Sequence, residues 1–121
     1  MLFRSVFSKL GTGYNEGVYQ DALKYELIEA GYNVKSEISF PIKYGNTYIS
    51  GYNNRLDLLV NDEIILELKV KQGNPSSENI NQIRRYFSSF ITAKVGAIIC
   101  FPNKGFNKNS SYRKEIGRAH V

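Results

Sequence analysis

The strongest restriction on the fold comes from a continuous apolar run at residues 95–101. This run contains only Val, Gly, Ala, Ile, Cys and Phe, with no charged or polar side chain to face water. A strand with one wet face alternates apolar and polar residues, so an unbroken run of this length predicts a strand buried on both faces. Such a strand needs neighbours on both sides and a covering layer above and below.

Three segments have the apolar spacing of helices that could supply those layers. The first is residues 2–10. The second runs from Asn15, a good N-cap residue, to about Ala30, with Gly31 as its stop. The third begins after the break at residues 73–77 and ends near residue 93.

The middle of the chain predicts strands. Residues 36–44 alternate in polarity, with Pro41 indicating an edge or a bulge, and a Gly-Asn turn leads into residues 47–50. Residues 55–60 and 64–71 form two further strands on either side of a tight turn. The order of elements therefore predicts an α/β domain in which helices flank a mixed β-sheet.

The last seven residues, 115–121, look foreign to the rest of the chain. They can be back-translated into DNA that resembles the start of a widely used short-read sequencing adapter, read in frame. We therefore expect one domain over residues 1–114, followed by an artefactual tail; a coincidental natural C-terminus is the alternative. Residues from Pro102 onward are polar and predict a loop or a frayed end. His120 lies in the tail and carries no functional weight.

The residue inventory excludes several kinds of site. One cysteine, Cys100, rules out an internal disulfide and a zinc site built on cysteine pairs, and a single histidine makes a histidine-based triad untenable. No apolar run approaches the roughly 20 residues of a membrane span, and no signal-peptide pattern is present. We expect a cytoplasmic domain, without a membrane partner, whose chemistry uses carboxylates, Lys, Arg, Tyr and bound ions.

The positive charge is concentrated in the second half of the chain. The net charge is +5, and residues 1–60 contain six basic and six acidic residues, whereas residues 61–121 contain ten basic and five acidic residues. A one-sided basic surface suits a polyanion, because neutralised phosphates release counterions. The alternative is a charge that serves only solubility.

The sharpest candidate site combines Asp57 with Glu67 and Lys69. Side chains at i and i+2 share one face of a strand, so Glu67 and Lys69 point together, and the tight turn brings Asp57 across from Glu67. Two carboxylates and the intervening Leu68 carbonyl suit Mg²⁺, and a lysine beside the ion can orient or deprotonate water. The alternative is that Glu67, Lys69 and Lys71 form the wet face of an antiparallel strand.

A second pattern stands at the start of the second helix, where Gly13-x-x-Glu16-x-x-Tyr19 places Glu16 and Tyr19 on one helical face. With this pattern, the chain resembles the GxxExxY proteins, a branch of the PD-(D/E)xK nuclease superfamily, over about residues 10–102. The matching segments are Gly13–Tyr19, Ala22–Leu27, Arg55–Val60, Ile65–Lys69, the Gln82…Tyr86 pair and Gly96–Pro102. Cys100 departs from the polar residue that the family tends to have in the last segment.

The resemblance implies a restriction-endonuclease-like fold with the element order α-β-β-β-α-β. It also implies that Asp57, Glu67 and Lys69 are the metal-binding and catalytic triad and that Glu16 is an additional acid near the metal. From the later helix, Gln82 and Tyr86 would position water or a phosphate. Their i, i+4 spacing puts both beside the apolar stripe of that helix, and an ordinary amphipathic flank is the alternative.

These observations predict a nuclease that hydrolyses phosphodiester bonds in nucleic acid with Mg²⁺, or with Mn²⁺, held by Asp57, Glu67 and the Leu68 carbonyl. DNA and RNA both remain open as substrates. The competing hypotheses are a non-catalytic nucleic-acid- or protein-binding module and a structural domain without nucleic-acid contact. The side chains expected to contact the nucleic-acid backbone are Lys71, Arg84, Arg85, Lys94, Lys104 and Lys108.

Overall fold

The computed structural model describes residues 2–49, 55–71, 73–89, 92–102 and 112–117. Its three helices are α1 (Leu2–Leu10), α2 (Glu16–Glu29) and α3 (Ser77–Ser89). Its strands are β1 (Val34–Ser39), β2 (Ile42–Tyr44), β3 (Thr47–Ile49), β4 (Arg55–Val60), β5 (Ile64–Val70), β6 (Val95–Phe101) and β7 (Tyr112–Gly117).

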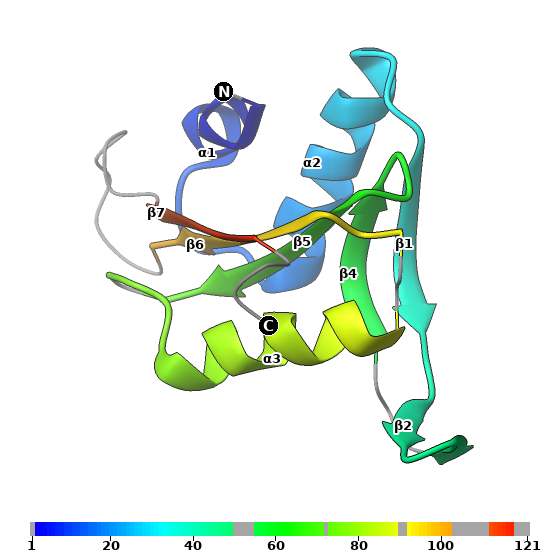
Figure 1. The fold of residues 1–121 in the computed structure, drawn as a ribbon. Helices are drawn as coiled ribbons and strands as arrows, with labels where there is room; N and C mark the ends of the chain where they lie inside the picture. Colours follow the sequence, from blue (N-terminus) through cyan, green and yellow to red (C-terminus); the bar gives the residue numbers. More distant parts are fainter. Residues whose placement is uncertain (1, 50–54, 72, 90–91, 103–111, 118–121) are drawn as a thin grey trace.

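The main sheet has five strands in the order β1-β4-β5-β6-β7, and β2 and β3 form a separate two-stranded hairpin. All neighbours in the main sheet are antiparallel except β5 and β6, which run parallel and are connected through α3. Helices α1 and α2 lie on one face of the sheet and α3 lies on the other (Figure 1). The predicted mixed sheet flanked by helices is therefore confirmed.

Strand β6 is covered on both faces, as its composition predicts. Every residue from Gly96 to Phe101 is buried. Ile99 and Phe101 belong to the apolar cluster under α1 and α2, whereas Ile98 and Cys100 belong to the cluster under α3. Alternate side chains of β6 thus pack into two separate apolar cores, one on each face of the sheet.

Aromatic contacts dominate the core under α1 and α2. The Tyr19 ring stacks on Phe101 with centroids 4.5 Å apart, and Phe7 lies 6.3 Å from Phe101. The Tyr19 hydroxyl donates to the Gly11 carbonyl at 2.5 Å. Burying the ring while satisfying its polar end lets α2 pack tightly against the sheet.

The core under α3 depends on a close approach between helix and strand. A Cβ atom at Gly96 would lie 2.5 Å from Ile83 Cγ2, so any larger residue there would push α3 away from β6. In the same cluster, Phe40 meets the Tyr86 ring edge-on with centroids 5.0 Å apart. Helix α3 is thereby held between β6 and the segment that follows β1.

Two segments differ from the sequence-based expectation. Residues 36–44 do not form one strand, because Pro41, which has no N–H to donate and a fixed φ, separates β1 from β2. The polar segment after Pro102 is not wholly loop, because residues 112–117 form β7. Strand β7 pairs with the free edge of β6, whose backbone groups need partners whatever side chains the neighbouring strand carries. Backbone pairing of this kind leaves no apolar signal in the sequence.

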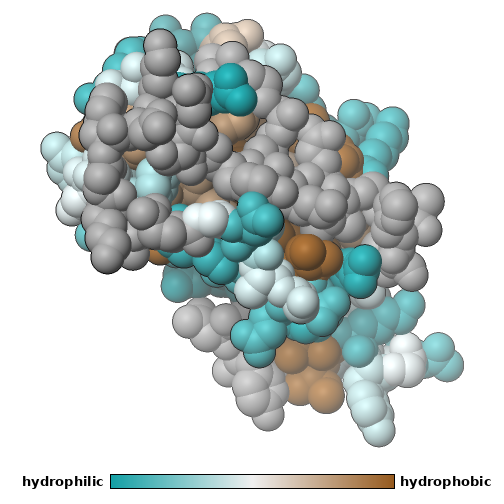
Figure 2. Space-filling view, turned by 90° about the vertical axis from the view of Figure 1, so that its left-hand side faces the viewer, coloured by the Kyte–Doolittle hydropathy of each residue, from teal (hydrophilic) through white to brown (hydrophobic). Residues whose placement is uncertain are grey.

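Among the coloured residues of Figure 2, most are hydrophilic and the hydrophobic ones form separate patches. Within the described ranges, no helix has the length and apolar character needed to cross a membrane.

Candidate functional site

Strands β4 and β5 separate at Asp57 and Glu67, which lie opposite each other just beyond the last paired residues, Leu58 and Leu66. The Asp57 backbone N–H donates to Glu67 Oε1 at 2.8 Å, and the Leu68 backbone N–H donates to Asp57 Oδ2 at 2.8 Å. Each carboxylate therefore replaces a backbone carbonyl that the diverging strands can no longer supply. This reciprocal arrangement, which we call the carboxylate clamp, fixes two acids side by side.

The carboxylate clamp is buried enough to perturb both acids. Glu67 is only 3% exposed. Burial, followed by the neighbouring Asp57 charge, raises the pKa of Glu67 to about 8. Burial also raises the pKa of Asp57, although the hydrogen bond from the Leu68 N–H opposes the shift. Two acids that resist ionising together form a place where added positive charge is favoured.

Lys69 supplies part of that positive charge and lies on the same strand face as Glu67, as the i, i+2 spacing predicts. Its charge lowers the pKa of both Asp57 and Glu67, against the larger effect of burial. Within the described part of the chain, its amine makes no hydrogen bond and no ion pair shorter than 4.0 Å. The alternative interpretation of this face as wet does not hold for Glu67, which α3 covers, whereas Lys69 and Lys71 remain partly exposed.

Tyr86 and Gln82 of α3 approach the carboxylate clamp from above this face. Gln82 Nε2 donates to the Tyr86 hydroxyl at 2.7 Å, and that hydroxyl donates to the Arg55 carbonyl at 3.1 Å. Burial, followed by the charge of the nearby Glu67, raises the Tyr86 pKa far above its usual range. Tyr86 therefore stays protonated and acts as a donor at any physiological pH.

The position of Tyr86 corrects one expectation from the helical spacing. Tyr86 is 2% exposed and belongs to the core cluster under α3, not to a flank beside it. The physical reason is that Phe40 and the polar groups of Glu67 and Arg55 meet it from other elements, so its ring and its hydroxyl are both satisfied in the interior.

Glu16 reaches the same end of β5 from the first turn of α2. Asn15 caps that helix as predicted, with its side chain accepting from the Val18 N–H at 3.3 Å. Glu16 Oε1 accepts from the Val70 N–H at 3.3 Å, and its charge contributes to the raised pKa of Asp57. No group of three or more Asp, Glu, His or Cys side chains in the described segments is compact enough to hold a metal ion. Glu16 is thus near the carboxylate clamp but separate from it.

Glu37 is a further acid at this site that the sequence reasoning missed. It lies across from Asp57 on β1, where its φ of 50° falls in the left-handed region. Its charge also raises the pKa of Asp57. The alternating pattern of residues 36–44 hides such an irregularity, and only the register with the Asp57 strand could have pointed to it.

An open pocket of about 520 Å³ lies next to Lys69, on the polar side of α3. Lys69, Gln82 and Arg85 were expected at the site, whereas Glu78, Asn79 and Asn81 were not. The residues at 78, 81, 82 and 85 follow helical i, i+3, i+4, i+7 spacing, so a polar stripe was present in the sequence. Its lining residues are Lys69, Glu78, Asn79, Asn81, Gln82 and Arg85.

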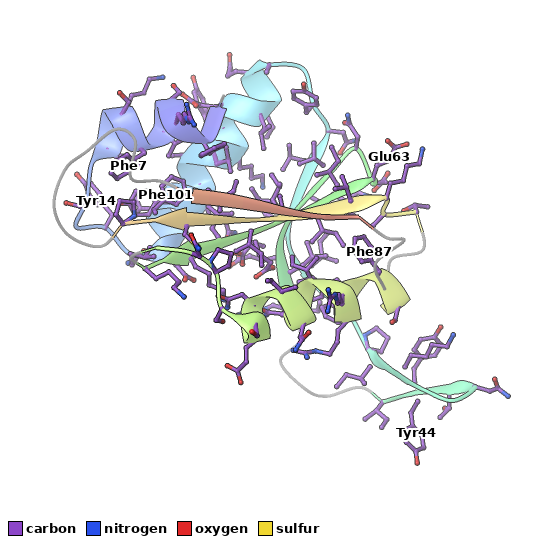
Figure 3. The ribbon with its side chains drawn as sticks, turned by 60° about the vertical axis from the view of Figure 1, so that its left-hand side comes forward. Phe7, Tyr14, Tyr44, Glu63, Phe87 and Phe101 are labelled. Atoms are coloured by element: carbon purple, nitrogen blue, oxygen red, sulfur yellow. The ribbon has the colours of Figure 1, made fainter. Side chains whose placement is uncertain are left out.

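The structure separates the basic residues predicted to contact nucleic acid. Arg85 lines the pocket, Arg84 is exposed beside it on α3, and Lys71 follows the end of β5. Lys94 lies at the opposite end of β5, where it pairs with Glu63 at 3.2 Å; Figure 3 shows Glu63 at the far side of the sheet from Tyr14. The structure therefore does not bring Lys94 to the site. Lys104 and Lys108 lie outside the described residues.

Comparison with known families gives a match over nearly the whole chain. Residues 2–114 match the model of the family described as the PD-(D/E)XK nuclease superfamily. No curated protein sequence matches the chain.

Solved structures match the fold. The structure of SSO0001 superposes with a TM-score of 0.60 at 19% identity, covering 84% of this chain and 48% of that one, so the chain spans about half of SSO0001. The alkaline exonuclease LHK-Exo from Laribacter hongkongensis gives a TM-score of 0.57 at 16% identity, covering 97% of this chain and 67% of that one. LHK-Exo in complex with dAMP gives 0.54 at 15% identity, with coverage of 97% and 76%. These similarities confirm the expected restriction-endonuclease-like fold.

Proposed function

Because the chain belongs to the PD-(D/E)XK nuclease superfamily, we propose that it hydrolyses phosphodiester bonds in nucleic acid with the help of a divalent metal ion. The observation that carries this proposal is the carboxylate clamp with Lys69 beside it: a buried Glu67 and a half-buried Asp57, both with raised pKa values, stand next to an amine that pairs with no described residue. Structural needs alone account for the clamp but give the Lys69 amine no partner among the described residues.

The chemistry of the carboxylate clamp fits Mg²⁺, or Mn²⁺ in its place. Its donors are all oxygens, and one or two carboxylates with water and phosphate are what Mg²⁺ uses in proteins. Each acid accepts a backbone N–H with one of its two oxygens. The ion would be held by Asp57, through its second oxygen, by Glu67 and by the Leu68 carbonyl. Burial and, after it, repulsion from Asp57 raise the Glu67 pKa, and a divalent ion would offset both effects. When bound, it would polarise the phosphate and acidify water.

The residues around the carboxylate clamp would orient the substrate. The Lys69 ammonium would donate to the attacking water or to a phosphate oxygen, where charge develops in the transition state. Tyr86, itself held by Gln82, would keep the Glu67 carboxylate in place, and Glu16 would tune the charge at the end of β5. Arg85 in the pocket, with Arg84 and Lys71 nearby, would bind the nucleic-acid backbone without reading its sequence.

We place the chain in the GxxExxY branch of this superfamily as part of the proposal. Glu16 and Tyr19 of the Gly-x-x-Glu-x-x-Tyr pattern support this placement, because each side chain has a separate role in the structure. Glu16 faces the end of β5, whereas Tyr19 is fully buried and bonded to the Gly11 carbonyl.

The proposal is tested by cleavage of labelled DNA and RNA in the presence of millimolar Mg²⁺. We expect the wild-type protein to cleave one of them, and Glu67→Ala and Lys69→Ala to lose that activity. Lys35→Ala is the control, since it removes an exposed lysine that pairs only with Asp62 on the surface. Full activity in both site variants would refute the proposal.

One observation favours a second candidate, a nucleic-acid-binding module without catalysis. Both acids of the carboxylate clamp hydrogen-bond to backbone N–H groups, so folding alone gives them a use. Titration calorimetry separates the two candidates. Heat of Mg²⁺ or Mn²⁺ binding that Glu67→Ala abolishes supports the nuclease, whereas salt-dependent retention on nucleic acid without metal binding supports the module.

A further inference from the structure

The hairpin of β2 and β3 stands apart from the main sheet. Each strand has three residues, Ile42–Tyr44 and Thr47–Ile49, and all six are exposed. The hairpin extends away from the body of the protein, and the Tyr44 side chain points outward from it (Figures 1 and 3). Figure 2 shows hydrophobic surface at the same lower end of the molecule.

Such a hairpin has little to stabilise it by itself. A two-stranded ribbon is marginally stable in water, and within the described residues neither strand pairs with a third. Tyr44 is 70% exposed and Tyr48 is 55% exposed, so large apolar surfaces face solvent where no folding requirement puts them. An exposed apolar cluster on a projecting element indicates a binding surface.

The pairing of the two strands assigns these side chains to faces. Lys43 lies directly across from Tyr48, and Tyr44 lies across from Thr47. Because cross-strand partners share a face, one face presents Tyr48 beside Lys43, and the other presents Tyr44 beside Thr47 and the exposed Ile42–Ile49 pair. Both faces therefore carry one exposed aromatic ring.

The charge around the hairpin favours nucleic acid over protein. Residues 38–56 contain no acidic side chain, while Lys43 and Arg55 are basic. Exposed aromatic rings next to a cation bind unpaired bases, since every base has a π-face and the cation attracts the backbone. Paired bases in a duplex keep their faces stacked on one another and offer no such surface.

The hairpin begins beside the carboxylate clamp. Phe40, two residues before β2, packs edge-on against Tyr86, and the Tyr86 hydroxyl contacts Glu67. Strand residues advance about 3.3 Å each, so Tyr44 is separated from Phe40 by roughly 13 Å of chain. A strand stacked on the hairpin would thus lie within a few nucleotides of the two acids.

We propose that the β2–β3 hairpin is a stacking platform for unpaired bases, which holds single-stranded nucleic acid next to the carboxylate clamp. The inference rests on the proposed function for its ligand and names the substrate class of that site: strands with unpaired bases. Tyr44 and Tyr48 stack on bases, and Lys43 neutralises the backbone.

Binding is measured without catalysis, by fluorescence anisotropy of a labelled oligothymidine and of a blunt duplex, in EDTA. The double variant Tyr44→Ala/Tyr48→Ala is expected to bind the single strand at least about 20-fold more weakly, with a much smaller change for the duplex. Tyr25→Ala is the matched control, because Tyr25 is 66% exposed on α2, and it should bind as wild type does. Tyr44→Phe/Tyr48→Phe keeps both rings and should keep the affinity.

The proposal is overturned if the alanine double variant binds the single strand as tightly as wild type. A second contrary outcome is a wild-type dimer in sedimentation that becomes a monomer in the double variant, with oligothymidine affinity unchanged. The hairpin would then join two copies of this chain. Because EDTA removes the metal, weaker binding by the double variant together with no Mg²⁺-dependent cleavage by wild type would refute the nuclease proposal alone. Cleavage by wild type with unchanged binding by the double variant would refute only the hairpin proposal.

Discussion

The two faces of the main sheet each bury one tyrosine whose hydroxyl donates to a backbone carbonyl, but the surroundings of the two rings differ. Under α1 and α2, Tyr19 donates to Gly11 and stacks on Phe101 within a wholly apolar cluster. Under α3, Tyr86 donates to Arg55 and also contacts Glu67 and Gln82. One face uses its tyrosine to fill a core, and the other uses it to hold a buried carboxylate.

Strand β5 makes this difference possible. Its alternation sends Leu68 toward α1 and α2 and sends Glu67 toward α3. The apolar face under α1 and α2 can stabilise the fold. The fold can therefore tolerate, on the α3 face, two neighbouring acids whose ionisation is unfavourable. We expect mutations on the two faces to separate into effects on stability and effects on activity.

The largest effect is expected from Phe101→Ala on the apolar face. Phe101 is fully buried against Tyr19 and Phe7, and removing such a ring costs about 3–5 kcal/mol of unfolding free energy. Urea denaturation measures the loss, and Tyr25→Ala on the exposed side of α2 should stay within about 0.5 kcal/mol of wild type. A loss below about 1 kcal/mol for Phe101→Ala would mean that this face is not the main source of stability.

Lys69→Met should show the opposite behaviour. The substitution keeps an unbranched side chain only one atom shorter but removes the charge, so we expect cleavage to fall by about 100-fold or more. Unfolding free energy should change by less than about 1 kcal/mol, because the Lys69 amine forms no ion pair in the described part of the protein. Single-turnover cleavage and urea denaturation on the same preparation test the separation; equal loss of stability and activity would contradict it.

Under metal-free conditions, we expect a pH dependence of stability that comes from Glu67. Its pKa is about 8 in the fold against 4.5 for a free side chain, so the folded state binds more protons than the unfolded state between these values. Stability therefore falls as pH rises through this window. We therefore compare the unfolding free energies of Glu67→Gln and wild type in EDTA. The difference, variant minus wild type, should increase by about 2 kcal/mol between pH 6 and pH 7.5.

The control for that experiment is Glu63→Gln, which removes an exposed carboxylate at the far end of the sheet. Its stability relative to wild type should not change with pH over the same range. A pH-independent difference for Glu67→Gln would show that Glu67 is already ionised at pH 6.

The smallest effects distinguish the two tyrosines directly. Tyr19→Phe and Tyr86→Phe each remove one hydroxyl that donates to a backbone carbonyl, and each should cost about 1 kcal/mol of stability. Only Tyr86→Phe should also lower kcat, because only its hydroxyl contacts Glu67. Equal kcat values for the two variants would remove the functional difference between the faces.

Local sequence patterns were enough to predict much of the sheet and the core of the site. The unbroken apolar run required β6 to be buried on both faces, and the tight turn at residues 61–63 brings Asp57 across from Glu67. Both inferences depend on neighbouring residues and on strand alternation, which are local properties. The helix cap at Asn15 belongs to the same class.

Features that depend on distant segments could not be predicted. The face of Glu67 becomes buried only because the connection from β5 to β6 brings α3 across it, and Tyr86 becomes a core residue only because Phe40 and Glu67 meet it there. Strand β7 could not be predicted because its pairing with β6 uses backbone groups and does not depend on its side chains. The irregular backbone at Glu37 has no local signal either.

The carboxylate clamp has a consequence for how this domain would diverge over time. Asp57 and Glu67 each accept a hydrogen bond from a backbone N–H where the two strands part, so a lineage that no longer needs catalysis would keep an acceptor at both positions. At position 67 an uncharged Gln would meet that need without the cost of a buried charge. The Glu67 charge and Lys69, whose amine bonds to no described residue, would therefore be the first features to drift, and in descendants of such a domain these two features would mark the copies under selection for catalysis.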